Sequence, residues 1–144
     1  MKISTRGRYS LRMMLDLAQN YDDDFVSLKD ISKRQNISKK YLEQIVPFLN
    51  RGNLLIANRG HMGGYRLSRP AANITVGEIL KCAEGSIYPV NCMENSPNVC
   101  PYSADCLTLP IWEGLYNVID KYLESITLQD VLDKKMGSSF SYNI

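Results

Sequence analysis

Three of the four cysteines in this chain are crowded into one short segment, where their thiols could bind a metal or change redox state. Cys92, Cys100 and Cys106 are spaced C-x7-C-x5-C in the stretch NCMENSPNVCPYSADC. The chain has no C-x-x-C pair, which a zinc ribbon or a thioredoxin-type site would need. Three interpretations therefore stay open: an iron-sulfur cluster or another metal, a thiol-disulfide switch, or cysteines without a special role.

The amino-terminal sequence and the lengths of the apolar runs indicate which environment these cysteines meet. The opening stretch MKISTRGRYSLRMMLDLAQ has scattered basic residues and no apolar block before a small-residue cleavage site, so we expect no secretory signal. No apolar run is long enough to span a membrane. We therefore expect a cytoplasmic protein, and in a reducing cytoplasm crowded cysteines more often bind metals or act in redox chemistry than form structural disulfides.

Charge is divided unevenly between the two halves of the chain. Residues 1–69 carry 13 Lys and Arg against 6 Asp and Glu, whereas residues 70–144 carry 4 against 9. A basic half favours a polyanionic partner, of which nucleic acid is the obvious candidate. A small redox enzyme that uses the thiols is the alternative class, but the sequence offers no Ser/His/Asp set, paired acid or nucleotide-binding loop to support it.

The basic half has the sequence signals of a helix-turn-helix. Apolar residues at helical spacing predict a first helix over residues 5–21. Two shorter amphipathic segments follow, with Ser27 and Ser38 in N-cap positions and Gly52 at the end of the second. Two helices joined by so short a turn are typical of a helix-turn-helix.

A hairpin completes the predicted DNA-binding fold. The alternating stretches at residues 54–57 and 65–67 flank the sequence NRGHMGG. Its glycines, Gly60, Gly63 and Gly64, are expected to adopt positive φ angles that other residues would resist. Since the hairpin follows directly on the helix-turn-helix, the sequence predicts a winged helix.

The acidic half begins with a capped helix and contains a long amphipathic one. Thr75 and Glu78 form a capping box for a helix that ends near Gly85. Beyond the cysteines an apolar stripe repeats every three or four positions, and its members are Trp112, Leu115, Tyr116, Ile119, Tyr122, Leu123 and Ile126. We expect this stripe to pack against the same helix of a second copy, with packing against its own domain as the alternative. A short helix capped by Thr127 and a loosely held tail follow.

The predicted fold class is mainly α (α+β), a winged helix-turn-helix with a long C-terminal dimerisation helix. Residues 1–85 are expected to form the DNA-binding domain, residues 86–106 the cysteine-bearing loop, and residues 107–144 the dimerisation helix and tail. The fourth cysteine, Cys82, is interpreted as a buried apolar side chain of the DNA-binding domain.

The predicted DNA-binding residues lie mainly on the second helix of the turn and at the hairpin tip. In a winged helix that second helix enters the major groove with its N-terminal residues leading. Gln44 can form two hydrogen bonds with adenine there. Glu43 can accept a hydrogen bond from cytosine or repel wrong sequences. Arg59 is placed to enter an adjacent minor groove. The complete predicted set is Ser38, Lys39, Lys40, Tyr41, Glu43, Gln44, Arg59, Gly60, His61, Lys2 and Arg6.

Several stretches together resemble the Rrf family of bacterial winged-helix transcriptional regulators. They are MKISTRGRYSLRMMLDLA, KYLEQIVPFLNRG, RGHMGGYRLSRP, ITVGEIL and ITLQDVL, and they span nearly the whole chain. The resemblance implies a homodimer with crossing C-terminal helices, a DNA-binding head at each end and a cluster loop next to the dimerisation helix. In the IscR-like branch three loop cysteines bind a 2Fe-2S cluster, and Cys92, Cys100 and Cys106 fall where those cysteines belong.

The chain departs from the family pattern in two ways: its first cysteine gap is longer than in the C-x5-C-x5-C spacing of the IscR-like branch, and a fourth cluster ligand is unassigned. The IscR-like branch has a histidine three residues beyond the last cysteine, where this chain has Leu109. The NsrR-like branch uses an aspartate near the amino terminus of the partner subunit, where this chain has Arg8. The open candidates are water, an exogenous thiol, and the carboxylates of Glu94, Asp105 and Glu113.

The resemblance implies a dimeric regulator, chiefly a repressor, that senses iron-sulfur cluster status through the three loop cysteines. The alternative is a cluster-free, CymR-like regulator of cysteine and sulfur metabolism, controlled by an enzyme of cysteine biosynthesis as its protein partner. The tail SYNI and the stretch STRGRYSLRMMLDLA are about as similar to that branch as to the IscR-like one. Both interpretations predict a double-stranded DNA operator and a second copy of the chain as partners.

Overall fold

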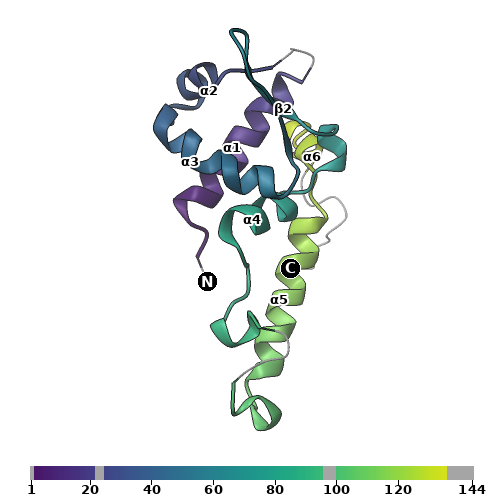
Figure 1. The fold of residues 1–144 in the computed structure, drawn as a ribbon. Helices are drawn as coiled ribbons and strands as arrows, with labels where there is room; N and C mark the ends of the chain where they lie inside the picture. The colour runs from purple at the N-terminus through teal and green to yellow at the C-terminus, as the bar shows by residue number, and fades with distance from the viewer. Residues whose placement is uncertain (1, 22–24, 96–99, 136–144) are drawn as a thin grey trace.

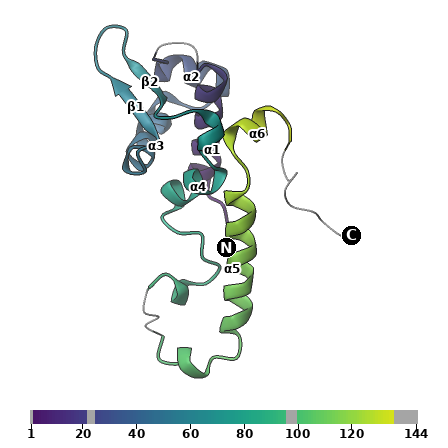
Figure 2. The same ribbon diagram turned by 90° about the vertical axis from the view of Figure 1, so that its right-hand side faces the viewer.

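The protein consists of a helical head from which one long helix projects (Figures 1 and 2). The computed structural model describes residues 2–21, 25–95 and 100–135, so the predicted tail beyond residue 135 lies outside the described residues. The elements are α1 (Thr5–Gln19), α2 (Leu28–Gln35), α3 (Lys39–Arg51), β1 (Leu55–Asn58), β2 (Gly64–Leu67), η1 (Ala71–Asn73), α4 (Val76–Glu84), η2 (Asn91–Met93), η3 (Ser103–Asp105), α5 (Leu109–Glu124) and α6 (Leu128–Leu132). This mainly helical fold with a two-stranded sheet confirms the predicted winged-helix class.

Helices of the head begin at the side-chain caps that the sequence predicts. The hydroxyls of Ser27 and Ser38 each accept a hydrogen bond of 3.1 Å from the amide three residues further on. At the start of α4, the Glu78 amide donates to Thr75 Oγ1 at 3.0 Å, and the Thr75 amide donates to Glu78 Oε2 at 2.9 Å. Each cap satisfies an amide that has no partner inside its helix.

The turn between α2 and α3 is fixed by local contacts. Asn36 closes α2 in the left-handed conformation, with φ 53°. The Ser32 hydroxyl donates to the carbonyl of Ile37 at 2.6 Å, and the Ile37 side chain is buried. The orientation of α3 relative to α2 is therefore held by backbone geometry, a hydrogen bond and a buried anchor.

The base of the hairpin is joined to the segment before α2. β1 and β2 pair antiparallel with Leu55 opposite Leu67. Val26 and Tyr65 exchange two backbone hydrogen bonds, of 2.9 and 2.8 Å. A Cβ atom at Gly64 would lie 2.3 Å from the carbonyl oxygen of Val26, so only glycine lets the two backbones approach this closely.

The prediction that all three hairpin glycines adopt positive φ angles is wrong for two of them. Gly60 has a φ of 145°, but Gly63 and Gly64 are not in the positive region. Their requirement for glycine is steric, because a Cβ atom at Gly63 would lie 2.4 Å from the Asn58 carbonyl oxygen. The glycines therefore predicted a tight hairpin correctly, but at Gly63 and Gly64 the physical reason is close backbone approach and not a positive φ angle.

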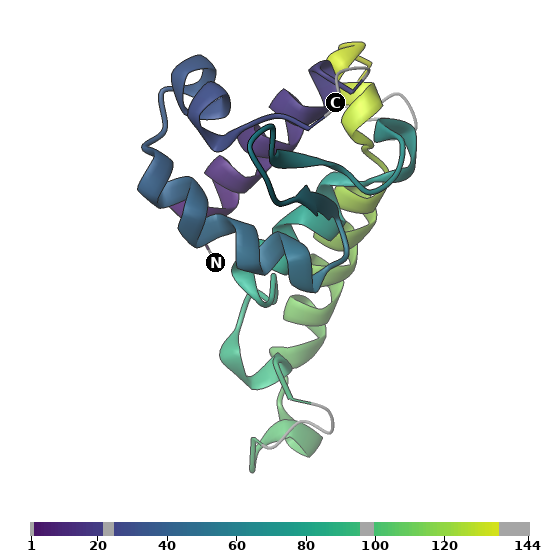
Figure 3. The ribbon, with the colours of Figure 1, turned by 45° about the horizontal axis from the view of Figure 1, so that its top comes forward.

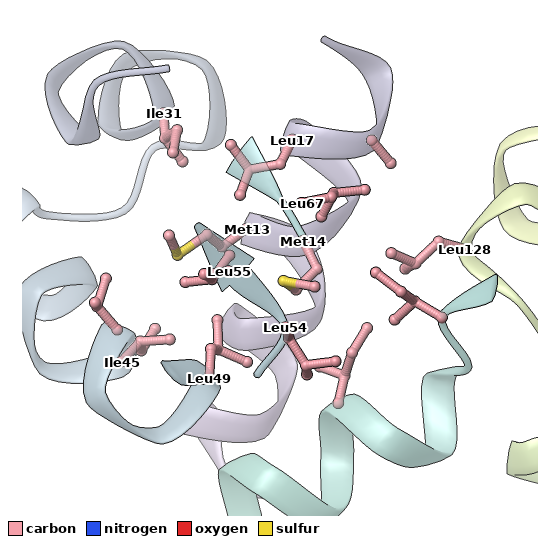
Figure 4. Packing of buried hydrophobic residues seen from close by; sticks show 14 of the residues in the cluster. Met13, Met14, Leu17, Ile31, Ile45, Leu49, Leu54, Leu55, Leu67 and Leu128 are labelled. Carbon is pink, nitrogen blue, oxygen red and sulfur yellow. The ribbon is translucent and has the colours of Figure 1, made fainter. Parts of the chain in front are cut away.

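A continuous apolar core joins α1, α2, α3 and the hairpin. Figure 4 shows side chains from these elements gathered around Met13 and Met14 of α1. The largest fully buried side chains are Met13, Met14, Leu17, Ile31, Leu42, Ile45, Leu49, Leu54, Leu67, Ile74, Ile79 and Leu128. Since burial of each such side chain contributes about 1.5–3 kcal/mol, this core fixes the relative positions of the elements that carry the hairpin and α3.

A buried carboxylate locks α2 onto α1. The Asp16 side chain is 1% exposed and receives two hydrogen bonds from the Arg34 guanidinium, of 2.9 and 2.7 Å. The Gln35 amide donates a third, of 3.0 Å. A buried charge is tolerated only when it is paired and hydrogen-bonded in this way.

Helix α5 is attached to the head by a smaller apolar cluster and by an ionic group. The Lys81 ammonium lies 2.5 Å from Asp120 Oδ1 and 3.0 Å from Glu124 Oε1. Burial alone would lower the pKa of Lys81, but hydrogen bonds to these two carboxylates, and their charges, raise it. The Thr75 hydroxyl also donates to Glu124, at 2.8 Å. Neither α5 nor any other helix within the described ranges is long and apolar enough to cross a membrane.

Candidate DNA-binding surface and cysteine segment

The N-terminal half of α3 presents most of its predicted DNA-reading side chains to solvent. The exposed members of the predicted set on this helix and its cap are Ser38, Lys39, Lys40, Glu43 and Gln44. Tyr41 is half-buried, and its ring meets the Tyr9 ring edge-on at 5.4 Å between centroids. The other side of the helix is anchored in the core by Leu42, Ile45 and Leu49. The helix is thus held from behind while its polar face stays open.

The hairpin tip extends from the head next to this helix (Figures 2 and 3). Arg59, Gly60 and His61 are all exposed at the tip, and Lys2 is exposed at the start of the chain. Lys39 of α3 and Arg59 of the tip line the same surface groove. The structure therefore brings Lys39 of α3 and Arg59 and Gly60 of the hairpin to one groove, whereas Gln44 lines a separate hollow with Arg6. The contacts of all these residues with DNA remain predictions.

Arg6 has an internal role that sequence reasoning did not find. Its Nε donates to the Ala83 carbonyl at 2.6 Å, and its guanidinium lies 4.2 Å from the centre of the Phe48 ring. The neighbouring Ser4 donates to Glu84 Oε1 from both its amide, at 3.0 Å, and its hydroxyl, at 2.7 Å. The start of α1 thereby connects the end of α4 with the C-terminal part of α3.

The three crowded cysteines lie in residues 85–108 between α4 and α5, here named the cysteine segment, whose described parts lead away from the winged-helix head. The chain leaves α4, passes along α5 and returns to the beginning of α5 at the far end of the molecule (Figures 1 and 2). In the described parts of this segment the regular structure is limited to the short turns η2 and η3. All three cysteines of this segment, Cys92, Cys100 and Cys106, are half-buried.

The structure does not assemble these cysteines into a metal site. Among the described residues, no group of three or more Cys, His, Asp or Glu side chains is close enough to hold a metal ion. The donor set nevertheless fits an iron-sulfur cluster, because three thiols occur on one segment whose described parts contain no α-helix or strand. The three cysteines lie outside the buried apolar clusters, although Ile87 of the same segment belongs to the smaller one.

Cys106 lies just before α5 in surroundings that favour its thiolate. Its sulfur is 3.4 Å from Thr108 Oγ1. Hydrogen bonds from the Thr108 hydroxyl, and from the backbone amides of Thr108 and Leu109, lower the pKa of the Cys106 thiol. In the head the opposite holds, because burial, and then the charge of Glu78, raise the pKa of Cys82. Since the thiolate is the metal ligand, Cys106 is the better prepared of the two.

Cys82 and the candidates for a fourth ligand are placed as follows. Cys82 is half-buried and packs against the main apolar core, as expected for a structural cysteine. Glu94 accepts a hydrogen bond of 3.0 Å from the Ser86 hydroxyl within the cysteine segment. Asp105 and Glu113 are exposed. Arg8 is exposed on α1, far along the chain from the cysteines, and donates to Thr5 Oγ1 at 3.0 Å.

The predicted apolar stripe of α5 divides between two faces. One set is half-buried and consists of Trp112, Tyr116, Ile119, Tyr122 and Leu123, the last four of which pack against the head. Ile126 lies beyond the end of α5 and is only 5% exposed, within the head's own apolar cluster. Leu115 faces outward at 40% exposure, together with Ile111 at 58% and Val118 at 56%. Sequence reasoning missed Ile111 and Val118, although their spacing from Leu115 is the same helical signal.

The sequence matches one family of known proteins over nearly its whole length. The model of the Rrf2 family, described as an iron-dependent transcriptional regulator, matches residues 3–134. The chain belongs to the Rrf2 family. Within it, the HTH-type transcriptional regulator IscR of Cereibacter sphaeroides is 41% identical over 139 residues, which cover 94% of this chain and 90% of that protein.

Two solved Rrf2-like structures show the same fold. IscR of T. potens superposes with a TM-score of 0.74 at 34% identity, covering 99% of this chain and 94% of that one. CymR, the global cysteine regulator of B. subtilis, superposes with a TM-score of 0.70 at 36% identity, covering 93% and 98%. Because the relatives of this Rrf2-family chain are transcriptional regulators, the chain is a DNA-binding transcriptional regulator and not an enzyme.

Proposed function

We propose that the protein is a homodimeric repressor whose operator binding depends on an iron-sulfur cluster, of the 2Fe-2S type, held by three cysteines of one segment. The cysteines are Cys92, Cys100 and Cys106. The observation that carries the proposal is that three free cysteines of one segment lie outside the buried apolar clusters, and that one of them has a lowered thiol pKa. The description of the family as iron-dependent supports it. We expect the protein to act in the cytoplasm, where bacterial operators lie.

The residues around Cys106 suit a sulfur that binds iron. Thr108 donates from its hydroxyl, and the amides of Thr108 and Leu109 add hydrogen bonds to the same sulfur. Hydrogen bonds to ligating sulfurs tune the potential and stability of such centres. A bound cluster would supply sensitivity to iron, oxidants or other small reactive molecules. The fourth ligand is proposed to be water, an exogenous thiol or one of the nearby carboxylates, Glu94, Asp105 and Glu113.

The reading surface is proposed to consist of α3 and the hairpin tip. The major groove accepts an α-helix, and an exposed glutamine such as Gln44 can make two hydrogen bonds with adenine. Glu43 next to it would accept from cytosine and repel phosphates at wrong registers. Lys39 and Lys40 would contact phosphates, and Arg59 would enter the adjacent minor groove.

The homodimer is proposed to form through α5. Ile111, Leu115 and Val118 leave an outward apolar face on this helix. Beside it, an apolar hollow of about 450 Å³ opens between α1, α4, α5 and α6, with Leu11 and Leu123 among its walls. Self-complementary packing about a two-fold axis would cover both. Because α5 carries the cysteine segment away from its own head, antiparallel pairing of two α5 helices would bring each segment near the partner's head.

A route for regulation within one protomer is also proposed. Glu84 ends α4 immediately before the cysteine segment, and it is held by Ser4 at the start of α1. Arg6, two residues further on, contacts both the end of α4 and Phe48 on α3. A change in the segment would therefore alter contacts that position the reading helix. Half-sites of a dimer lie about 34 Å apart, so a small reorientation would change affinity strongly.

Anaerobic purification tests the cluster directly. Wild-type protein should show visible absorbance and bind iron and sulfide, and Cys→Ala substitution at residue 92, 100 or 106 should abolish both. Cys82→Ala is the matched control, since Cys82 packs in the head and should leave absorbance unchanged. Colourless wild-type protein after reconstitution would reject the cluster and favour the CymR-like alternative, in which a cysteine-biosynthesis enzyme is the partner.

Operator binding tests the reading surface. Gln44→Ala should weaken binding to the preferred operator by about 1–3 kcal/mol and relax discrimination at one base pair. Lys40→Ala should weaken binding to all sequences similarly and reduce the salt dependence. Band-shift titrations that show no change for either variant would reject the assignment of α3 to the major groove.

A further inference from the structure

A cationic groove separates the reading helix from the hairpin. It has a volume of about 530 Å³ and lies between α2, α3 and the hairpin, with Lys29, Lys39 and Arg59 among its lining residues. None of its described lining residues carries a carboxylate. Within the described ranges none of these three cations forms an ion pair. The groove therefore concentrates positive charge that the described part of the protein does not neutralise.

The walls of this groove are held at a fixed separation. The double hydrogen bond between Val26 and Tyr65 ties β2 to the residues that lead into α2. The Arg66 guanidinium also lies 5.0 Å from the centre of the Phe25 ring, which adds a second contact between the same two segments. Since α2 is fixed to α3 by the turn and to α1 by Asp16, all three walls belong to one packed unit. A ligand would meet a preformed channel.

We propose that one strand of the DNA backbone runs through this groove and that Lys29 binds one of its phosphates. The inference rests on the proposed placement of α3 in the major groove and Arg59 in the adjacent minor groove. These two grooves of a duplex are always separated by one sugar-phosphate strand. That strand must pass between the two protein elements, and the cationic groove is the space between them.

The groove extends the DNA contact to α2, which the helix-and-wing interpretation leaves out. Lys29 is exposed on the first turn of α2 and lines the groove together with Lys39 and Arg59. Asn50 and Asn58 line the same groove and offer amide donors that can bind phosphate oxygens without charge. The strand would thus be held from both sides, by ammonium groups and by neutral donors. Such contacts set register and do not read sequence.

The salt dependence of binding tests the role of Lys29. The probe is a duplex that wild-type protein selects from a random-sequence pool, titrated from low to physiological salt. Lys29→Ala should make the negative slope of log K against log salt shallower by about 1 and weaken binding about fivefold at physiological salt. Lys33→Ala is the matched control, because Lys33 is an exposed lysine of the same helix that does not line the groove. It should keep the wild-type slope.

Uncharged phosphates locate the contact on the DNA. A methylphosphonate placed at each position in turn should weaken wild-type binding most in the strand between the two contacted grooves, and Lys29→Ala should lose that sensitivity. If Lys29→Ala and Lys33→Ala have equal slopes, or if methylphosphonates in that strand have no effect, the groove assignment is overturned while DNA reading by α3 stands. If wild-type protein selects no duplex at all, the proposed reading surface fails together with this inference.

Discussion

The winged-helix head and the cysteine segment solve different structural problems. In the head, side chains such as Met13 and Leu49 are fully buried, and the carboxylate of Asp16 has all its charge paired. In the cysteine segment, only short turns are regular in the described residues, and Leu107 is 92% exposed. The chain itself therefore fixes the surface proposed to read DNA. In the described residues it does not hold the thiols in an arrangement that could bind a metal.

The largest expected difference between the two regions is in their contribution to folding. Leu49→Ala should destabilise the protein by about 2–5 kcal/mol, because it leaves a cavity on the buried side of α3. Leu107→Ala in the cysteine segment should change stability by less than about 0.5 kcal/mol. Urea unfolding of metal-free protein at one fixed concentration, followed by circular dichroism, measures both. Similar midpoints for the two variants would contradict the comparison.

A second contrast concerns the reactivity of the thiols. In metal-free protein Cys106 should react with iodoacetamide faster than Cys82 near neutral pH, because its hydrogen bonds lower the pKa of its thiol while burial raises that of Cys82. The Cys106 reaction should also persist to lower pH. Peptide mass spectrometry of timed samples measures both rates. Thr108→Ala should move the Cys106 profile to higher pH, and an unchanged profile would show that the hydroxyl has no such effect.

Capping provides a smaller contrast, between the N-terminus of α4 and the N-terminus of α5. Thr75→Ala should cost about 1 kcal/mol, since it removes a capping box and the hydrogen bond to Glu124. Thr108 occupies the equivalent position of α5 but makes no side-chain cap, so Thr108→Ala should have little effect on stability. Thermal unfolding compares the two variants. Equal losses would mean that α5 depends on a cap absent from this structure.

These contrasts also show which features the sequence could predict. Caps at Ser27, Ser38 and Thr75 were predictable because both partners lie within three residues of each other. The wing followed from local turn chemistry, although the reason for glycine at Gly63 depended on a backbone contact across the hairpin. How the apolar stripe of α5 divides between two faces depends on where the head packs against this helix. The sequence therefore assigned Ile126 to a partner subunit, although it is buried in an apolar cluster of its own protomer.

The candidate sites follow the same division. Exposure of Gln44 and its neighbours could be predicted from helical periodicity, because their helix is anchored by buried residues on its other side. The contact of Arg6 with Phe48 could not, since it joins helices whose mutual position only the fold determines. The three cysteines were identified by their crowding, but their sequence spacing contains no information on how the thiols lie relative to one another in the folded protein.

The smallest expected effect concerns acid stability of the head. Burial alone would raise the pKa of Glu78, but hydrogen bonds from Thr75 and Arg69, and the charge of Arg69, lower it below the ordinary value for a glutamate. A carboxylate with a lowered pKa stabilises the folded state above that value and loses its contribution as the pH falls through the folded-state pKa. Glu78→Gln should therefore lose a few tenths of a kcal/mol at pH 7 and converge on wild type in acid. A difference that is constant with pH would contradict this.

The buried carboxylate between α1 and α2 has a consequence for measurements on this protein. Dissolved ions screen exposed charges strongly but screen the ion pair of Asp16 and Arg34 less, because its carboxylate is 1% exposed, although the Arg34 side chain is 42% exposed. Raising the ionic strength should thus weaken contacts with phosphates while the frame that carries α3 keeps its shape. The slope of affinity against salt should then report mainly the number of neutralised phosphates.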